Sequence, residues 1–190
     1  MVATSASMIK QARRLCHDVY LGMGYIGSPY PFHLIPEDET ARNTYLVAID
    51  SANNVVGTIR VSTGSPYKII DTWNGHLFHQ QAQLISTARC NQGFELGALA
   101  VRKDQAHLRI SWGLYNMAYR WALANHCDYG IISMDQRAFR SLEMLGWFAI
   151  QIGEPMYYLG SMTLPAILPI LEQPVMAVDK AKPWFHFLQV

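Results

Sequence analysis

Residues Phe94 to Val101 read FELGALAV, a short apolar run with one acid inside it, and this is the most informative stretch of the chain. The run predicts a buried strand. Glu95 lies at its start, between Phe94 and Leu96. A carboxylate in that position loses part of its hydration, which raises its pKa and suits it to accept a proton near neutral pH. Two structural alternatives stay open: Glu95 lies on the solvent face at the strand end, or it pairs with an arginine.

The segments on either side of this strand show helical and strand patterns in turn. Their order is helix, two antiparallel strands, insertion, strand, long helix, strand, short helix and further strands, which predicts a mixed α/β sheet with helices packed on it. The expected helices cover 7–21, 76–86, 107–125 and 136–145, and the expected strands cover 44–50, 54–61, 94–101, 128–134, 147–152, 156–164 and 184–190. Residues 63–92 are expected to be irregular apart from their one helix, and the tail carries four prolines between residues 165 and 183. No repeat or linker divides the chain, so a single domain is expected over residues 1–190.

Composition and charge argue against several classes of function. Of the 190 residues, 51% are hydrophobic and 15% are charged, an apolar excess that fits either an apolar cavity or partner-facing patch, or a large core. The net charge of +1 includes no cationic block, so nucleic acid is not expected as a partner. No apolar run approaches the roughly 20 residues that span a bilayer, and the N-terminus has no secretory pattern. Three cysteines without CxxC spacing are expected to be free thiols in a reducing cytoplasm, and no metal site is expected.

Cations occur at two places near the predicted strand. Arg60 lies in the apolar segment GTIRV, and a buried arginine normally has an anion beside it. Glu95, Asp38 or a substrate carboxylate could supply that anion, and a structural ion pair is slightly favoured over substrate binding. The second group follows the strand and leads into the long helix, where it either attracts phosphate or forms a solvated turn. Its members are Arg102, Lys103 and Arg109.

Three consecutive segments resemble the central block of the GCN5-related N-acetyltransferase (GNAT) fold. They are FELGALAVRKD at 94–104, the long helix, and IISMDQRAFRSLEMLGW at 131–147. The resemblance implies a GNAT-like, mixed and mostly antiparallel central sheet flanked by helices, with a bulged strand before a phosphate-binding turn. It also implies a cleft for the acyl donor between the strands at 95–101 and 128–134, which splay apart in this fold.

The turn after the strand departs from the GNAT pattern. GNAT enzymes that use acyl-coenzyme A carry a glycine-rich turn that cradles the pyrophosphate. The corresponding stretch here, AHLRISWG at 106–113, has Gly113 as its one glycine, and the bulky Leu108, Ile110 and Trp112 hinder close backbone approach. The departure favours a donor without pyrophosphate, namely an acyl chain on the phosphopantetheine arm of acyl carrier protein. No separately bound cofactor is expected.

Two branches of the GNAT-like fold are similar to this chain. The acyl-homoserine-lactone synthases, whose acceptor is S-adenosylmethionine, match an N-terminal helix with Arg14 and the residues Asp38, Glu39, Arg60 and Glu95. They usually carry an arginine three residues after the strand's glutamate, where this chain has Ala98. The long-chain N-acyl amino acid synthases are similar in length, in the FELGALAV block and in GEPMYYLGSMTLPAIL at 153–168, and the resemblance covers most of residues 8–170.

The resemblance to the N-acyl amino acid synthases implies a function. It implies transfer of a long fatty acyl chain from acyl carrier protein to the amino group of an amino acid, tyrosine in the best-known type. Two alternatives remain. One is a signal synthase that makes an acyl lactone from S-adenosylmethionine, and the other is a non-catalytic acyl-binding module on a GNAT scaffold.

The same resemblance implies roles for individual residues. Glu95 would act as the base, and backbone N–H groups of Leu99, Ala100 and Val101 would bind the thioester carbonyl and the pantetheine amides. Arg60 would hold a carboxylate, and the amino acid would face Tyr25, with Tyr20, Tyr30 and Phe32 as further candidates. The expected walls of the acyl pocket are Trp112, Tyr115, Ile132 and Met134. Because acyl carrier protein is acidic, a cationic docking rim is expected, made of Arg102, Lys103, Arg109, Arg137 and Arg140.

Overall fold

The computed structural model describes residues 1–33, 35, 42–64, 66–90, 93–105, 108–144 and 146–173. The chain divides into two compact units. The first combines Met1–Ser62 with Leu96–Ala118, and the second combines Thr63–Glu95 with Tyr119–Val190. The expectation of a single domain over residues 1–190 stays a prediction.

The fold is a mixed α/β fold with an open, mostly antiparallel sheet flanked by helices, as the sequence predicted. The strand order is β1-β2-β3-β4-β7-β5, and β6 pairs with β7 beside this path. The strands are β1 (Asn43–Ile49), β2 (Val55–Thr63), β3 (Gly93–Val101), β4 (Tyr129–Asp135), β5 (Ile150–Gln151), β6 (Met156–Tyr158) and β7 (Ser161–Pro169). The helices are α1 (Ala6–Gly22), α2 (Lys68–Thr72), α3 (Ala82–Cys90), α4 (Leu108–Ala124) and α5 (Gln136–Met144).

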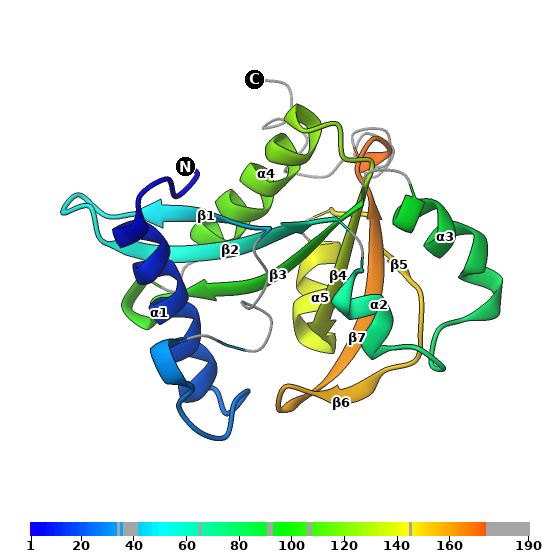
Figure 1. Cartoon of the computed structure of the whole chain (residues 1–190), viewed down its shortest axis with the longest axis horizontal. Helices are drawn as coiled ribbons and strands as arrows, with labels where there is room; N and C mark the ends of the chain where they lie inside the picture. Colours follow the sequence, from blue (N-terminus) through cyan, green and yellow to red (C-terminus); the bar gives the residue numbers. More distant parts are fainter. Residues whose placement is uncertain are drawn as a thin grey trace. The chain divides into compact units, whose positions relative to one another are not determined.

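In the first unit, helix α1 packs on the β1–β2 hairpin (Figure 1). The helix begins where the Ser5 hydroxyl accepts the Met8 N–H at 3.2 Å, which satisfies one of the amides that a helix start leaves free. Its Ala12 is fully buried against Tyr45 and Val47 of β1. The apolar face of this amphipathic helix therefore packs on one face of the hairpin.

Helix α4 approaches β2 closely at Gly57. A Cβ atom at Gly57 would lie 2.6 Å from Ile110 Cγ2 and 3.2 Å from Leu114 Cδ1. The missing side chain lets the start of the helix pack directly on the strand. Leu114 and Ala118, four residues apart on one face of the helix, are both buried.

The second unit is built around the long pairing of β4 with β7. The two strands run antiparallel from Tyr129 opposite Pro169 to Asp135 opposite Thr163, and Ile131 and Ile167 are fully buried in the core beside them. Helices α2 and α3 pack on the same core through Ile70 and Ala88. Helix α5 follows β4 directly and ends at Met144, and Gly146, two residues further on, has a φ of 96° in the left-handed region that favours glycine.

The described residues between 63 and 90 contain more helix than the sequence predicted. Helix α2 was missed, and the helix expected at 76–86 occurs as α3 at Ala82–Cys90, after a 3₁₀ turn at His79–Gln81. Leu77 and Phe78 are held in an extended form, because the Phe78 N–H donates to Ile152 O at 2.9 Å and Leu77 forms a β-bridge with Gly153. Tertiary pairing has overridden the local helical pattern.

Three further expectations for the C-terminal part are corrected. The strand expected at 156–164 is a hairpin, because Leu159 and Gly160, with φ of 43° and 72°, form its turn. The same strand was expected to end at 164, yet β7 continues to Pro169, and the carbonyl of Pro165 accepts the Ile152 N–H at 3.0 Å. The strand expected at 147–152 is reduced to Ile150–Gln151, because the Phe148 N–H donates to the Gln173 side chain. The strand expected at 184–190 lies outside the described residues.

Candidate active site

Glu95 is a buried carboxylate in the first half of β3. The side chains on either side of it in sequence, Phe94 and Leu96, are buried, and Glu95 itself is 7% exposed. Its Oε1 accepts the backbone N–H of Ile69, in the first turn of α2. The alternative of a strand-end glutamate on the solvent face is therefore wrong. A buried carboxylate with an oriented amide donor is the kind of group that an enzyme can use to accept a proton.

The segment around α2 holds the start of β3 at a second point. The Tyr67 hydroxyl donates to Gly93 O at 2.6 Å, two residues before Glu95. Burial, and to a smaller extent the nearby Cys127 and Glu95, raise the pKa of Tyr67, so its hydroxyl stays protonated and remains a donor. A Cβ atom at Gly93 would lie 2.2 Å from Ala88 O, so this position requires glycine.

The sequence did not identify Tyr67 and Ile69 as site residues. Both lie in the stretch that was expected to be irregular, 26 residues before their partners. A tyrosine and a backbone amide at that separation leave no local signal, because only the folded chain brings them to β3. The proline, tyrosine and short apolar run at 66–70 become informative once the burial of Glu95 is known.

The second half of β3 has an irregular backbone. Ala98 has φ of 51°, the left-handed region that a non-glycine residue rarely adopts, and it does so inside a strand. This is the conformation that a β-bulge uses to re-aim backbone groups, and the resemblance implied a bulged strand here. Leu99 and Val101 are half-buried, and Ala100 is buried. Their proposed contacts with a thioester stay a prediction.

Arg60 is buried beside the irregular half of β3. It is 5% exposed in β2, in register with Tyr45 of β1. Its Nη2 lies 3.3 Å from the position that a Cβ atom would take at Gly97. Gly97 therefore leaves the space that the guanidinium occupies, next to the left-handed residue Ala98. One anion suggested for Arg60, the carboxylate of Asp38, lies outside the described residues, as does Glu39.

The loop after α1 that carries Tyr25 and Tyr30, called the aromatic loop below, is hydrogen-bonded to a buried histidine. His17 Nε2 accepts the Tyr30 N–H at 3.1 Å, so the ring hydrogen lies on Nδ1, which donates to Asp18 Oδ1 at 3.0 Å. His17, Asp18 and His33 bring their ligand atoms within 4.8 Å of one another, but neither ring nitrogen of His17 is free for a metal ion in this arrangement. Tyr25 packs edge-on against Tyr20, with ring centroids 5.4 Å apart, and its role toward the amino acid stays a prediction.

The expected walls of the acyl pocket are divided between the two units. Trp112 and Tyr115 lie on α4 within the first unit, where Trp112 is half-buried and Tyr115 is buried. Ile132 and Met134 lie on β4 within the second unit, where Ile132 is buried and Met134 is half-buried. A cleft lined by all four stays a prediction.

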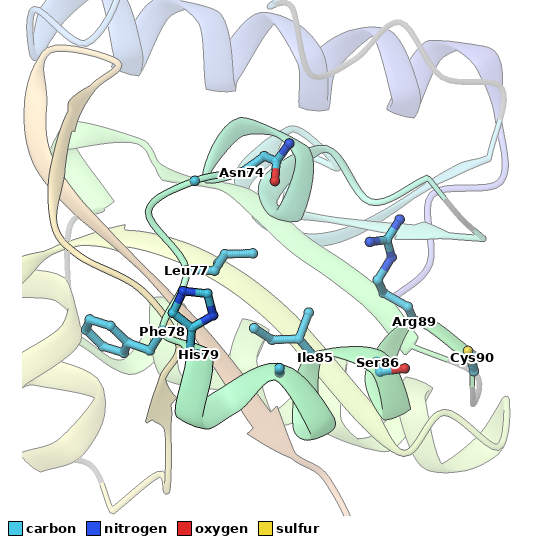
Figure 2. A pocket seen from close by; sticks show the side chains of 10 residues that line it. Asn74, Leu77, Phe78, His79, Ile85, Ser86, Arg89 and Cys90 are labelled. Carbon is cyan, nitrogen blue, oxygen red and sulfur yellow. The ribbon is translucent and has the colours of Figure 1, made fainter.

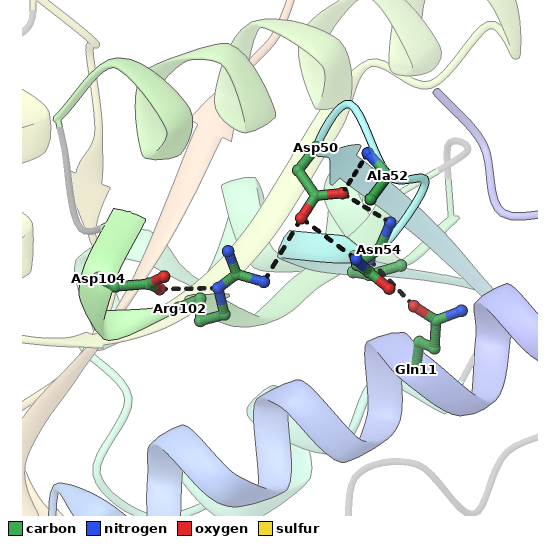
Figure 3. Close-up of polar contacts among 7 residues, drawn as sticks. Gln11, Asp50, Ala52, Asn54, Arg102 and Asp104 are labelled. Atoms are coloured by element: carbon green, nitrogen blue, oxygen red, sulfur yellow. Dashed lines mark hydrogen bonds and ion pairs between the residues drawn. The ribbon is translucent and has the colours of Figure 1, made fainter.

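Arg102, the first cation of the predicted docking rim, already has two acidic partners. Its Nε lies 2.7 Å from Asp104 Oδ1 and its Nη1 lies 3.6 Å from Asp50 Oδ2. Figure 3 draws both contacts as dashed lines. Hydrogen bonds from the backbone and side chain of Asn54, together with Arg102, lower the pKa of Asp50, so this acid stays charged. The remaining rim residues are exposed, with two in the first unit and two on α5 in the second. They are Lys103, Arg109, Arg137 and Arg140.

Solved structures with the same fold include an N-acyl amino acid synthase and acyl-homoserine-lactone synthases. The structure of FeeM, an N-acyl amino acid synthase from uncultured soil microbes, is 18% identical and covers 98% of this chain and 96% of its own, with a TM-score of 0.73. The acyl-homoserine-lactone synthase LasI is 14% identical over 90% of this chain and 89% of its own, with a TM-score of 0.73. BjaI, a coenzyme A-dependent acyl-homoserine-lactone synthase, is 15% identical over 94% and 84%, with a TM-score of 0.66.

These structural likenesses are too remote in sequence to show more than the GNAT-like fold. No curated protein gave a match. The sequence itself matches the profile of one family, described as N-acyl amino acid synthase FeeM, over residues 11–172. That match includes β3 with Glu95, and it identifies the protein as an N-acyltransferase that belongs to the FeeM family of N-acyl amino acid synthases.

Proposed function

We propose that this enzyme moves a long fatty acyl chain from the thioester of acyl carrier protein to the amino group of an amino acid, with tyrosine as the first acceptor to test. The observation that carries the proposal is the buried carboxylate of Glu95, which is held by the Ile69 N–H within a chain of the N-acyl amino acid synthase family. FeeM, which shares the fold, is itself an N-acyl amino acid synthase.

The proposed reaction needs a base because an ammonium group has no lone pair. Glu95, directly or through a water, takes one proton from the ammonium of the amino acid. The amine nitrogen then attacks the thioester carbonyl carbon and forms the new C–N bond. As the tetrahedral intermediate collapses, the C–S bond breaks and the nitrogen releases its second proton. The thiolate of the phosphopantetheine arm leaves and takes up that proton. In this proposal, backbone N–H groups of Leu99 to Val101 stabilise the oxyanion.

Arg60 is our candidate for holding the carboxylate of the amino acid. A guanidinium presents parallel N–H donors that match a carboxylate. Arg60 is buried in β2, and its Nη2 lies over Gly97, two residues after the proposed base in sequence. In this role Arg60 would fix the acceptor by its carboxylate, while Tyr25 and the aromatic loop face the amino acid side chain.

Two observations bear on the acyl donor. BjaI is coenzyme A-dependent, so the fold alone does not decide between coenzyme A and acyl carrier protein. The stretch at 106–113 in this chain has one glycine where coenzyme A-dependent GNAT enzymes have a glycine-rich turn, which supports the acyl carrier protein. The exposed cations Lys103, Arg109, Arg137 and Arg140 are the groups that an acidic carrier would meet.

The setting that we propose is the bacterial cytoplasm. The cysteines Cys16, Cys90 and Cys127 are all free thiols, as expected in a reducing compartment. A search of the described helices finds none with the length and hydropathy needed to cross a membrane.

Mass spectrometry of lipid extracts from bacteria that express the chain would test this function. We expect N-acyl tyrosine or another N-acyl amino acid, and its absence from cells that express the Glu95→Gln variant. A purified enzyme that accepts acyl-coenzyme A as well as acyl carrier protein would remove the carrier-specific part of the proposal. Extracts with no new acyl product would contradict the proposed reaction.

Acyl-lactone synthesis is a second candidate, because LasI matches the fold with the same TM-score as FeeM. Ala98 argues against it, since acyl-homoserine-lactone synthases usually have arginine three residues after the glutamate. An acyl lactone in the same extracts, dependent on S-adenosylmethionine in the purified reaction, would identify that function instead.

A further inference from the structure

A pocket of about 540 Å³ lies in the second unit, between the loop from Asn74 to His79 and helix α3 (Figure 2). None of its lining residues is among the predicted site residues. Its volume is within the range of about 300–1,000 Å³ that is typical of small-molecule sites. The pocket is therefore large enough for a ligand of its own.

The loop that forms one wall of the pocket is held in place by the strands behind it. The Phe78 N–H donates to Ile152 O, and the Glu154 N–H donates to His76 O, both at 2.9 Å. A Cβ atom at Gly153 would lie 2.8 Å from His76 O, so only glycine allows this approach. These bonds hold the wall in one position, which lowers the entropy cost of ordering it when a ligand binds.

The interior of the pocket is apolar. Leu77, from the loop, and Ile85, from α3, both line it (Figure 2). Ile85 is buried in the core of the second unit, and Leu77 packs against that core. An apolar body placed between them would be removed from water on two sides.

The edge of the pocket has one permanent cation and no acid. Arg89 lies in the last turn of α3, and within the described part of the chain it forms no ion pair. Asn74, His79 and Ser86 complete the polar edge, and none of the ten lining residues is aspartate or glutamate. The edge therefore favours an anion, and a guanidinium fits a carboxylate with two parallel hydrogen bonds.

We propose that this pocket binds a carboxylate attached to an apolar chain, with the carboxylate at Arg89 and the chain between Leu77 and Ile85. The chemistry is shared by a free fatty acid and by an N-acyl amino acid. The first would be a ligand independent of acyl transfer, and the second would be the product of the reaction proposed above. The inference itself stands on the pocket and does not require Glu95 to be a base.

A thiol in the pocket makes its occupancy measurable at a defined place. Cys90 lines the pocket and is exposed, whereas Cys16 and Cys127 are buried. Modification of Cys90 by N-ethylmaleimide, followed by peptide mass spectrometry, should slow when the pocket is filled. Dodecanoate, its neutral analogue dodecanol and N-dodecanoyl tyrosine are the probes, each compared with and without ligand in the same variant.

We expect dodecanoate to protect Cys90, and Arg89→Gln to raise the concentration for half-protection by roughly tenfold. Arg89→Lys keeps the charge but loses the two parallel N–H donors, so its half-protection concentration should lie between those of wild type and Arg89→Gln. The exposed Lys10→Gln on α1 should have the wild-type half-protection concentration. Dodecanol should protect weakly, and equally in all variants. Stronger protection by N-dodecanoyl tyrosine than by dodecanoate would assign the pocket to product.

The proposal is overturned if saturating dodecanoate leaves Cys90 modification unchanged, or if Arg89→Gln is protected as well as wild type. Because Arg89 is exposed, its substitution should leave the unfolding midpoint unchanged, and this is checked by thermal unfolding. The same titration in the Glu95→Gln variant separates the two proposals. Protection retained there supports the pocket whether or not the acyl-transfer mechanism is correct.

Discussion

The two halves of β3 differ in what they present. The first half, Gly93–Glu95, is deeply buried and carries an acidic side chain, which accepts the Ile69 N–H, while the Tyr67 hydroxyl holds the Gly93 carbonyl. The second half, Leu96–Val101, carries no charged side chain and has the left-handed backbone at Ala98. The strand thus has a buried carboxyl side chain near its start and an irregular backbone in its second half.

The difference shows how a single strand can serve both partners in an acyl transfer. A proton acceptor needs a fixed side chain, and a thioester carbonyl needs backbone donors that are not used by a neighbouring strand. A bulge releases such donors without adding a side chain. If this division of roles is correct, changes in the first half should lower the catalytic rate, and changes beside the second half should weaken substrate binding.

The largest effect is expected from Glu95→Gln. The amide keeps the shape of the side chain but cannot take a proton, so kcat should fall by roughly 10²-fold or more. Initial rates of N-acyl tyrosine formation with acyl carrier protein as donor measure this. Glu172→Gln, an exposed position after β7, is the matched control and should keep the wild-type rate. A wild-type kcat in Glu95→Gln would remove the first half of β3 from the chemistry.

Tyr67→Phe should give the next largest effect. It removes the hydrogen bond to Gly93 O, so the strand before Glu95 loses a fixed point, and we expect kcat to fall about tenfold with little change in KM. The loss of one buried bond should lower the free energy of unfolding by about 1–2 kcal/mol. Tyr119→Phe is the control, because Tyr119 is also buried but contacts Trp147 instead. Equal kinetic effects of the two changes would mean that Tyr67 stabilises the fold without positioning the base.

The same tyrosine predicts a pH dependence of stability. Because burial raises the pKa of Tyr67 in the folded protein, its contribution is complete below the unfolded pKa of about 10 and is lost as pH rises through the higher folded pKa. Urea unfolding between pH 8 and pH 11 should show wild-type stability falling at the alkaline end. The free energy of unfolding of Tyr67→Phe should fall less over the same range. Part of its remaining loss should come from Tyr119, because burial raises the pKa of that residue too. An unchanged alkaline slope in Tyr67→Phe would contradict this.

Gly97→Ala tests the second half of the strand through Arg60. The new methyl group would lie 3.3 Å from Arg60 Nη2, so the guanidinium must shift by a few tenths of an ångström. We expect KM for the amino acid to rise about threefold with kcat nearly unchanged. Gly113→Ala on α4, which meets nothing within 4 Å, is the control. A fall in kcat without a change in KM would argue against Arg60 as the carboxylate anchor.

The smallest effect is expected where β3 ends. Reversing Arg102 and Lys103 together to Glu should raise KM for the acyl carrier donor by about twofold to threefold at low salt, because Arg102 is already paired with Asp50 and Asp104. The control is the double reversal Lys10→Glu and Arg14→Glu on α1. An unchanged KM at low salt would remove these two residues from the docking rim.

The elements with strong periodicity were predictable from sequence, and those fixed by distant partners were not. The amphipathic pattern of α1 and α4 and the apolar run of β3 gave their positions within a few residues. Helix α2 was missed because its five residues are too few for a periodic signal. The continuation of β7 through Pro165 was missed because proline argues against a strand, yet its carbonyl still pairs with the Ile152 N–H.

The candidate site divides in the same way. The burial of Glu95 and Arg60 was predictable, since each lies in an apolar strand. The donors that hold the start of β3 are the Tyr67 hydroxyl, bonded to Gly93 O, and the Ile69 N–H, bonded to Glu95, and no spacing in the sequence connects either residue to the strand. The ion pair between Arg102 and Asp50 could not be predicted from the sequence either, because only the folded β1–β2 hairpin brings Asp50 to the end of β3.

The pH dependence of Glu95→Gln tests the central claim most directly. If Glu95 removes the proton from the acceptor, the variant must wait for amine that is already deprotonated, a fraction that rises about tenfold per pH unit below the pKa of the amine. We predict that single-turnover rates at saturating acyl carrier donor converge from pH 7 to pH 9, with the variant regaining most of its deficit while wild type changes little. Parallel pH profiles for the two proteins would show that Glu95 is not the base.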